Sequence, residues 1–205
     1  MDSPGADAHS CVMGSVVIFE LLLAAAAGWA FWRGWRPSGP EMIPWMIGFA
    51  AIAFAALVGA LRYGGIDALE PVHRFVSTFA GGAGILLIAA SVALRHLVTV
   101  PANWKTPVAW ALVGAVAAAA VAGVGDVGIA GRAVAILLIL GAVLRQWTAR
   151  PRVAHLLLLA VVFLLVAAYA ARPAAELVGL NGLNAYHLLL TVGVVMFGLA
   201  IRPTR

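Results

Sequence analysis

The sequence predicts an all-α, polytopic membrane protein: a single bundle of seven spanning helices. Hydrophobic residues make up 64% of the 205 residues and charged residues only 10%, whereas soluble domains are about 45–50% apolar. The apolar residues also gather in seven runs, each close to the about 20 residues that a helix needs to cross a bilayer. Neither a soluble domain nor a linker interrupts these runs. We therefore expect one transmembrane domain, residues 1–205.

Each run begins and ends at residues that suit a span boundary. The polar, acidic N-terminus lacks the positive region of a secretory signal, so the first run is expected to remain as a helix. Pro44 stands in the first turn of the second run, where proline costs little, and Gly64 and Gly65 follow its end. The expected helices cover residues 11–32, 43–61, 71–94, 107–124, 127–147, 153–171 and 183–201.

One alternative reduces the count to six spans. In it, the fourth and fifth runs form a partial hairpin around residues 123–128. Each run is nevertheless long enough for a span of its own, which favours seven.

The distribution of charge predicts the orientation, because cytoplasmic loops carry an excess of arginine and lysine. An outer N-terminus and an inner C-terminus satisfy this rule. The inner segments then carry one acid, Glu41, and many bases: Arg33, Arg36, Arg95, Lys105, Arg145, Arg150, Arg152, Arg202 and Arg205. The outer segments carry mostly acids (Asp2, Asp7, Asp67, Glu70, Asp126 and Glu176) with Arg62, Arg74 and Arg172. This pattern indicates an inner (plasma) membrane protein.

Several function classes are excluded by what the sequence lacks. The arginines are scattered at helix ends, and no basic-aromatic patch or nucleic-acid motif is present. The single cysteine, Cys11, permits no intramolecular disulfide. Lys105 is the only lysine, so the seventh helix cannot form a retinal Schiff base. Walker, GxSxG, HExxH and Rossmann motifs are also absent.

Two charged residues interrupt apolar runs. Glu20 lies in the first run and Arg132 near the start of the fifth, so both belong to the outer half of the bundle. A charge at membrane depth costs about 2.5–3.5 kcal/mol on insertion scales, which requires a partner. We expect either an ion pair between them or a role in a site, with Arg132 binding substrate.

Histidines and hydroxyl groups mark two further helix faces in the same outer layer. His73 and Ser77 are four residues apart at the start of the third run, and Gly81 and Gly84 continue that face as bare backbone. The last run carries a polar stripe of Asn181, Asn184, His187 and Thr191. The structural alternatives are an interfacial histidine and an interhelical hydrogen-bond ladder.

If these side chains meet, they form a site with two imidazoles, a carboxylate and a hydroxyl. Such a set suits a zinc ion with an open position for water, and it equally suits a proton-linked site. In the zinc hypothesis His73 and His187 are ligands, Glu20 is a ligand or general base, and Ser77 and Asn184 polarise the substrate. Haem ranks lower, because His73 and His96 would stand about 34 Å apart along one helix.

The seven-helix pattern loosely resembles the CREST-type membrane hydrolases, which include alkaline ceramidases and adiponectin-receptor-like proteins. That family has Ser and then His four residues later, an Asp, and HxxxH in the last helix. Here the order is His73 then Ser77, and His187 is followed by Thr191. The resemblance implies a zinc-dependent hydrolase that acts on lipid.

Two other functions compete with lipid hydrolysis. One is a small-molecule or ion binder or transporter with Glu20 and Arg132 in its cavity, and the other is an assembly subunit whose polar groups pair among the helices. Expected partners are membrane lipid and a protein partner or second copy, but no nucleic acid.

Overall fold

The computed structural model describes residues 5–35, 39–121, 127–179 and 181–201, and within these ranges the chain is helical with no strand. Three short elements interrupt the α-helices: the 3-10 helices η1 (Pro40–Met42) and η2 (Asp67–Leu69) and the π-helix η3 (Ala80–Gly84). The α-helices are α1 (Gly5–Trp35), α2 (Ile43–Tyr63), α3 (Glu70–Phe79), α4 (Ile85–His96), α5 (Ala102–Val121), α6 (Val127–Ala149), α7 (Pro151–Val178) and α8 (Gly182–Ala200).

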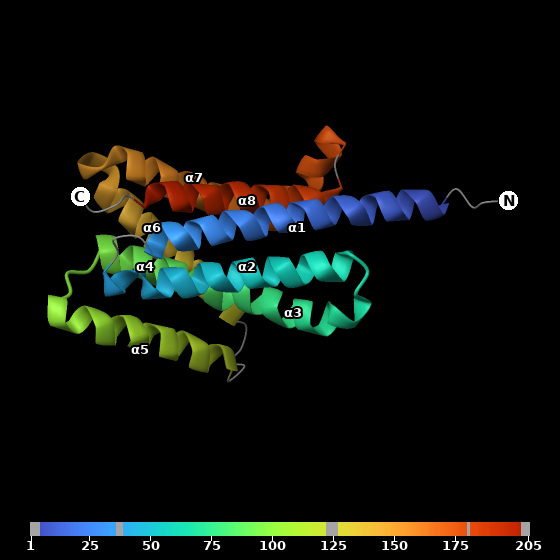
Figure 1. The fold of residues 1–205 in the computed structure, drawn as a ribbon. Helices are drawn as coiled ribbons and strands as arrows, with labels where there is room; N and C mark the ends of the chain where they lie inside the picture. The colour runs from blue at the N-terminus through green and yellow to red at the C-terminus, as the bar shows by residue number, and fades with distance from the viewer. Residues whose placement is uncertain (1–4, 36–38, 122–126, 180, 202–205) are drawn as a thin grey trace.

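The long helices lie side by side, and consecutive ones run in opposite directions (Figure 1). α1 begins at the end of the molecule where α2 ends and α3 begins, whereas α8 ends at the opposite end. α1 packs closely on both α2 and α8, α7 packs on α8, and α6 packs on α4 and α7. α5 lies at the periphery against α2 and α4.

Six described helical segments are long and apolar enough to cross a membrane: Gly14–Trp35, Pro40–Tyr63, Asp67–His96, Ala130–Ala149, Pro151–Ala171 and Gly182–Ala200. The class of an all-helical protein with membrane-spanning helices is thereby confirmed. The six do not include α5, which carries Asn103 and Lys105 near its start. Seven spans remain a prediction, and most of the alternative hairpin at residues 123–128 lies outside the described residues.

Four helices differ most from the boundaries that the sequence predicts. α1 runs from Gly5 to Trp35, so it begins six residues earlier and ends three residues later than predicted. The third is divided into α3, η3 and α4, with the π-helix at the glycines of the sequence AGGAG. α5 begins at Ala102 and contains Pro107 within it. α7 continues through Pro173 to Val178 and ends at Gly179, whose φ of 66° is a left-handed cap.

The three largest fully buried side chains lie in the half of the bundle toward the end of α8. Trp45 and Phe49 of α2 and Phe197 of α8 form an aromatic cluster with ring centroids 4.6–6.3 Å apart. The indole of Trp45 donates a hydrogen bond of 2.9 Å to the Ala30 carbonyl, so its polar atom is satisfied. These rings bring α2 into contact with α8, and the Trp45 hydrogen bond connects α2 to α1.

Arg33 of α1 forms hydrogen bonds with the C-terminal end of α8. Its guanidinium donates to the carbonyls of Ile201 at 2.5 Å and Gly198 at 3.4 Å. The last carbonyls of a helix have no partner within it and carry partial negative charge, so an arginine there stabilises the helix end.

Two glycines permit the closest approach between helices. A Cβ atom added to Gly48 of α2 would lie 2.6 Å from the Gly84 carbonyl oxygen, and one on Gly84 would lie 3.4 Å from the Gly48 carbonyl. Small residues allow membrane helices to approach backbone to backbone. The contact holds η3 against α2, directly beside the site described below.

We expect Gly48→Ala to lower the thermal unfolding midpoint in detergent, because the new methyl group would meet backbone that cannot rotate away. Overpacking of this kind costs about 1–3 kcal/mol. Gly114→Ala in α5 is the matched control, since a Cβ atom there meets nothing within 4 Å. Equal midpoints for both variants would contradict this account of the α2–η3 contact.

Candidate functional site

A cavity of about 280 Å³ lies inside the bundle, in the half toward the N-terminal end of α1. Residues of α1, α2, α3, η3, α4, α6, α7 and α8 line it, and most of them are aliphatic. Ile52 and Val194 belong to its wall, and Phe49 and Phe197 of the aromatic cluster follow about one turn farther along the same helices. The cluster therefore closes the cavity on that side.

The cavity brings together most of the polar residues that the sequence singles out. Five of the six predicted site residues line it: Glu20, His73, Ser77, Arg132 and His187. They come from α1, α3, α6 and α8, so residues distant in the sequence meet in one pocket. Asn184 does not line it; its amide donates a 2.8 Å hydrogen bond to the Ser15 hydroxyl, between α8 and α1.

Glu20 and His187 form the buried centre of the site. The Glu20 carboxylate is 1% exposed, and its Oε1 lies 3.2 Å from Nε2 of His187, which is 6% exposed. The other ring nitrogen, Nδ1 of His187, lies 2.9 Å from the Leu183 carbonyl oxygen. Glu20 thus has a partner on α8.

The hydrogen bond to Leu183 determines which nitrogen of His187 carries a hydrogen. A carbonyl oxygen only accepts, so Nδ1 of His187 must donate. Nε2 lies 3.2 Å from Oε1 of Glu20, but this carboxylate oxygen has no hydrogen-bond partner among the described residues. The two side chains are therefore in close contact without a hydrogen bond between them.

His73 lies beside this pair, and Gly59 of α2 contacts both His73 and Glu20. A Cβ atom on Gly59 would lie 2.7 Å from Cδ of Glu20 and 2.8 Å from Cε1 of His73, so both side chains rest against bare backbone of α2. Nδ1 of His73 lies 3.3 Å from the Ser77 hydroxyl.

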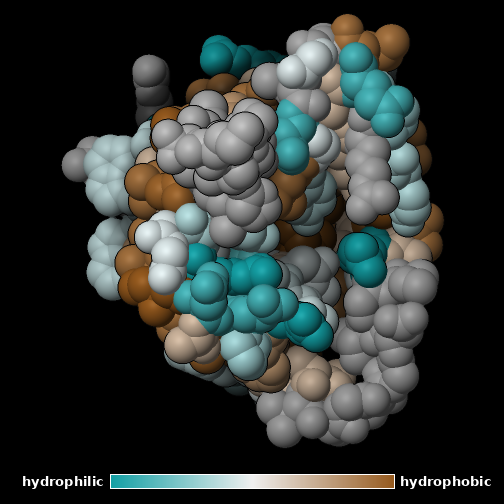
Figure 2. Space-filling model, turned by 90° about the vertical axis from the view of Figure 1, so that its right-hand side faces the viewer, coloured by the Kyte–Doolittle hydropathy of each residue, from teal (hydrophilic) through white to brown (hydrophobic). Residues whose placement is uncertain are grey.

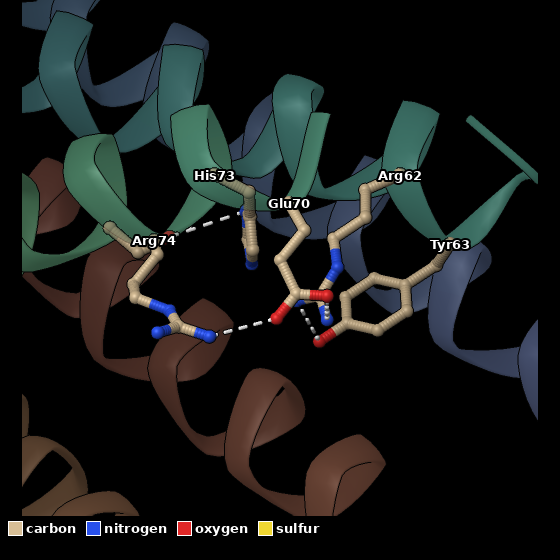
Figure 3. Close-up of polar contacts among 6 residues, drawn as sticks. Arg62, Tyr63, Glu70, His73 and Arg74 are labelled. Atoms are coloured by element: carbon tan, nitrogen blue, oxygen red, sulfur yellow. Dashed lines mark hydrogen bonds and ion pairs between the residues drawn. The ribbon is translucent and has the colours of Figure 1, made fainter. Parts of the chain in front are cut away.

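A cluster of charged residues, here called the charged rim, lies between His73 and the end of the molecule. It consists of Arg62, Glu70 and Arg74. Glu70 lies between two arginines, at 3.0 Å from Arg62 and 2.9 Å from Arg74 (Figure 3). The Arg62 guanidinium also covers the ring of Tyr63, which meets the His73 ring edge to face at 5.7 Å. Figure 2 looks at this end and shows hydrophilic residues gathered there, with hydrophobic residues on the flanks.

The cavity opens toward this end and toward the side of the bundle. Five of its lining residues are exposed: Gly81, Arg132, Ala168, Tyr169 and Tyr186. A second hollow of about 410 Å³ continues from it between α7 and α8, and the two share Ala168, Tyr169, Leu183 and Tyr186. These exposed residues lie on η3, α6, α7 and α8.

The zinc hypothesis receives no support from this geometry. The described residues contain no group of three histidine, cysteine, aspartate or glutamate side chains that could hold a metal ion. One nitrogen of each ring already has another partner: Nδ1 of His187 lies 2.9 Å from the Leu183 carbonyl oxygen, and Nδ1 of His73 lies 3.3 Å from the Ser77 hydroxyl.

Other polar residues of the predicted stripe form hydrogen bonds with the backbone of α8. Asn181 caps α8, because its Oδ1 accepts a 2.8 Å hydrogen bond from the Leu183 amide. Thr191 donates to the carbonyl of His187 at 2.7 Å. The sequence analysis did not identify Gly59, Tyr63 or Tyr186 as site residues. Only Tyr63 has a sequence feature that could have indicated it, because it follows Arg62 at the end of an apolar run.

Gly59→Ala tests whether Glu20 and His73 depend on this close approach. We expect the methyl group to displace both side chains and to destabilise the protein by about 1–3 kcal/mol, because the space is already filled. Gly28→Ala on the same bundle meets nothing within 4 Å and serves as the control. Thermal unfolding in detergent measures the cost, and unchanged stability of Gly59→Ala would refute the packing argument.

Comparison with known proteins identifies a family without assigning an activity. No curated protein and no solved structure matches the chain. A family model described as a family of unknown function, DUF6962, matches residues 15–205. The match begins within α1 and includes all the residues that line the cavity. The chain therefore belongs to the DUF6962 family.

Proposed function

We propose that this chain is an inner-membrane protein that binds an amphipathic small molecule, such as a membrane lipid, in the cavity of its outer half. The observation that carries the proposal is the meeting of five polar residues from four helices in one otherwise aliphatic cavity. Ligand pockets typically combine apolar walls with a few convergent polar groups. An assembly subunit would instead satisfy its polar groups between helices and leave no cavity.

The proposed topology has seven spans, with α5 as the fourth, the N-terminus outside and the C-terminus inside. The opposite directions of consecutive helices support an odd number of crossings. Exposed Trp32, Trp35 and Trp147 lie at the ends of α1 and α6, near the arginine-rich segments. Tryptophan is enriched at membrane interfaces. The cavity then opens to the outer leaflet.

A second candidate, lipid hydrolysis of the CREST type, rests on the contact between His73 and Ser77 beside the Glu20–His187 pair. It requires a third metal ligand that the described residues do not bring to the site. Binding without chemistry is therefore the preferred function. Zinc that copurifies with the wild type and is lost in His73→Ala and His187→Ala, as measured by elemental analysis, would reverse this preference.

Lipid binding can be tested by photolabelling in nanodiscs with a phosphatidylethanolamine that carries a diazirine on one acyl chain. We expect labelled peptides from the cavity walls on α7 and α8. Gly81→Leu should reduce that labelling several-fold, because a Cβ atom on Gly81 meets nothing within 4 Å and the side chain can occupy the cavity.

Gly28→Leu is the matched control, since its Cβ atom also meets open space but the residue does not line the cavity. Equal labelling of the cavity walls in both variants would reject the proposed binding site. Monodisperse elution of both variants establishes that they are folded.

Cysteine labelling on intact cells tests the orientation. In a Cys11→Ser background, we expect Asp67→Cys, at the exposed turn before α3, to react with a membrane-impermeant maleimide. Arg150→Cys, at the exposed start of α7, should react only after permeabilisation. The opposite pattern would invert the topology and place the cavity at the cytoplasmic face.

A further inference from the structure

We propose that the end of the bundle where α4 ends and α7 begins binds the phosphate headgroup of an anionic phospholipid. Three arginines form the site and are here called the arginine cluster. They are Arg95 of α4, Arg145 of α6, and Arg150, which stands between α6 and α7. The cluster lies at the opposite end of the molecule from the cavity, so the inference goes beyond the cavity and does not depend on its ligand.

Helix packing brings the arginine cluster together. α6 packs on both α4 and α7. The Arg145 guanidinium donates a 2.9 Å hydrogen bond to the carbonyl of Leu97, the residue directly after α4. Arg95 and His96 lie beside Ile201 at the end of α8, where they line a small hollow. The charges of all three arginines act on the His96 ring, so residues from three separate segments meet around one imidazole.

The charge balance at this end determines the sign of the ligand. Among the described residues, Glu41 is the only acid here, and its Oε2 lies 3.7 Å from Nζ of Lys105. Glu41 can neutralise one of four cations, namely Lys105 and the arginine cluster. Three positive charges therefore remain, whichever cation Glu41 pairs with. An anion bound among them would lower their mutual repulsion.

The surface beside the arginine cluster favours a lipid over a free anion. Leu137, Leu144 and Trp147 share one face of α6, since they are seven and three residues apart. They are 68%, 76% and 47% exposed, and they lie in the membrane-spanning segment Ala130–Ala149. Tryptophan is enriched at membrane interfaces, and arginine binds phosphate through charge-assisted hydrogen bonds. A headgroup on the arginines would thus place its acyl chains along this face, as in other basic lipid sites between membrane helices.

Photolabelling in nanodiscs compares two lipids that differ only in the headgroup. Phosphatidylglycerol and phosphatidylcholine probes with the same diazirine acyl chain are added in trace amounts to phosphatidylcholine nanodiscs, whose leaflets have equal composition. We expect the phosphatidylglycerol probe to label peptides of α6 and of the start of α7 about threefold more strongly, or better, than the phosphatidylcholine probe. Equal labelling of these peptides by both probes would overturn the proposal.

Charge-changing variants assign the preference to the cluster. Arg145→Gln/Arg150→Gln should reduce phosphatidylglycerol labelling to the level of phosphatidylcholine. Arg145→Lys/Arg150→Lys should keep most of the preference, because lysine also binds phosphate as a point charge. Arg62→Gln/Arg74→Gln is the control of equal net charge, at the charged rim of the other end. A preference that survives in the first variant, or that the control loses equally, would exclude the arginine cluster as the site.

A measurement on the wild type needs no variant. Phosphatidylglycerol added to the protein in detergent should raise the thermal unfolding midpoint more than phosphatidylcholine does, because a ligand that binds only the folded state stabilises it. Inorganic phosphate at the same concentration should leave the midpoint unchanged. Equal stabilisation by the two lipids would contradict headgroup recognition. Equal stabilisation by inorganic phosphate and phosphatidylglycerol would identify a site for free anions and overturn the lipid assignment.

Discussion

The burial of a carboxylate inside an apolar bundle is the constraint around which this protein is organised. Glu20 is nearly inaccessible, and an isolated charge at that depth would be costly. His187 places a ring nitrogen 3.2 Å from this carboxylate, and the Leu183 carbonyl orients the imidazole. Because α1 and α8 carry the two partners, their close packing is a requirement of the site as well as of the fold.

Glycine and the π-helix provide the room that this arrangement needs. Gly59 lets Glu20 and His73 lie against the backbone of α2, and the Gly48–Gly84 contact brings η3 to the same helix. π-Helical turns are rare and occur frequently at functional sites. Here η3 contributes Ala80 and Gly81 to the cavity wall, directly after the turn that carries Ser77. The irregular segment is thus part of the pocket.

The bundle has two halves with different physical character. Toward the end of α8, Trp45, Phe49 and Phe197 fill the space between α1, α2 and α8, and Arg33 caps α8. Toward the start of α1, the same helices enclose a cavity with a charged rim. This asymmetry favours a binding site with access from one face over a continuous channel, because the aromatic cluster closes the far side.

The sequence by itself determined the helical membrane class, since the length and apolarity of its runs leave few other ways to satisfy the backbone in lipid. It also placed Glu20, His73, Ser77 and His187 in one layer, because depth along a helix follows directly from residue number. Only the tertiary structure decided which of them meet. Rotation of each helix about its axis directs Asn184 to Ser15 and His187 to Glu20. Those rotations arise from side-chain packing between helices, such as the fit of Glu20 and His73 around Gly59, which spacing along one chain does not encode.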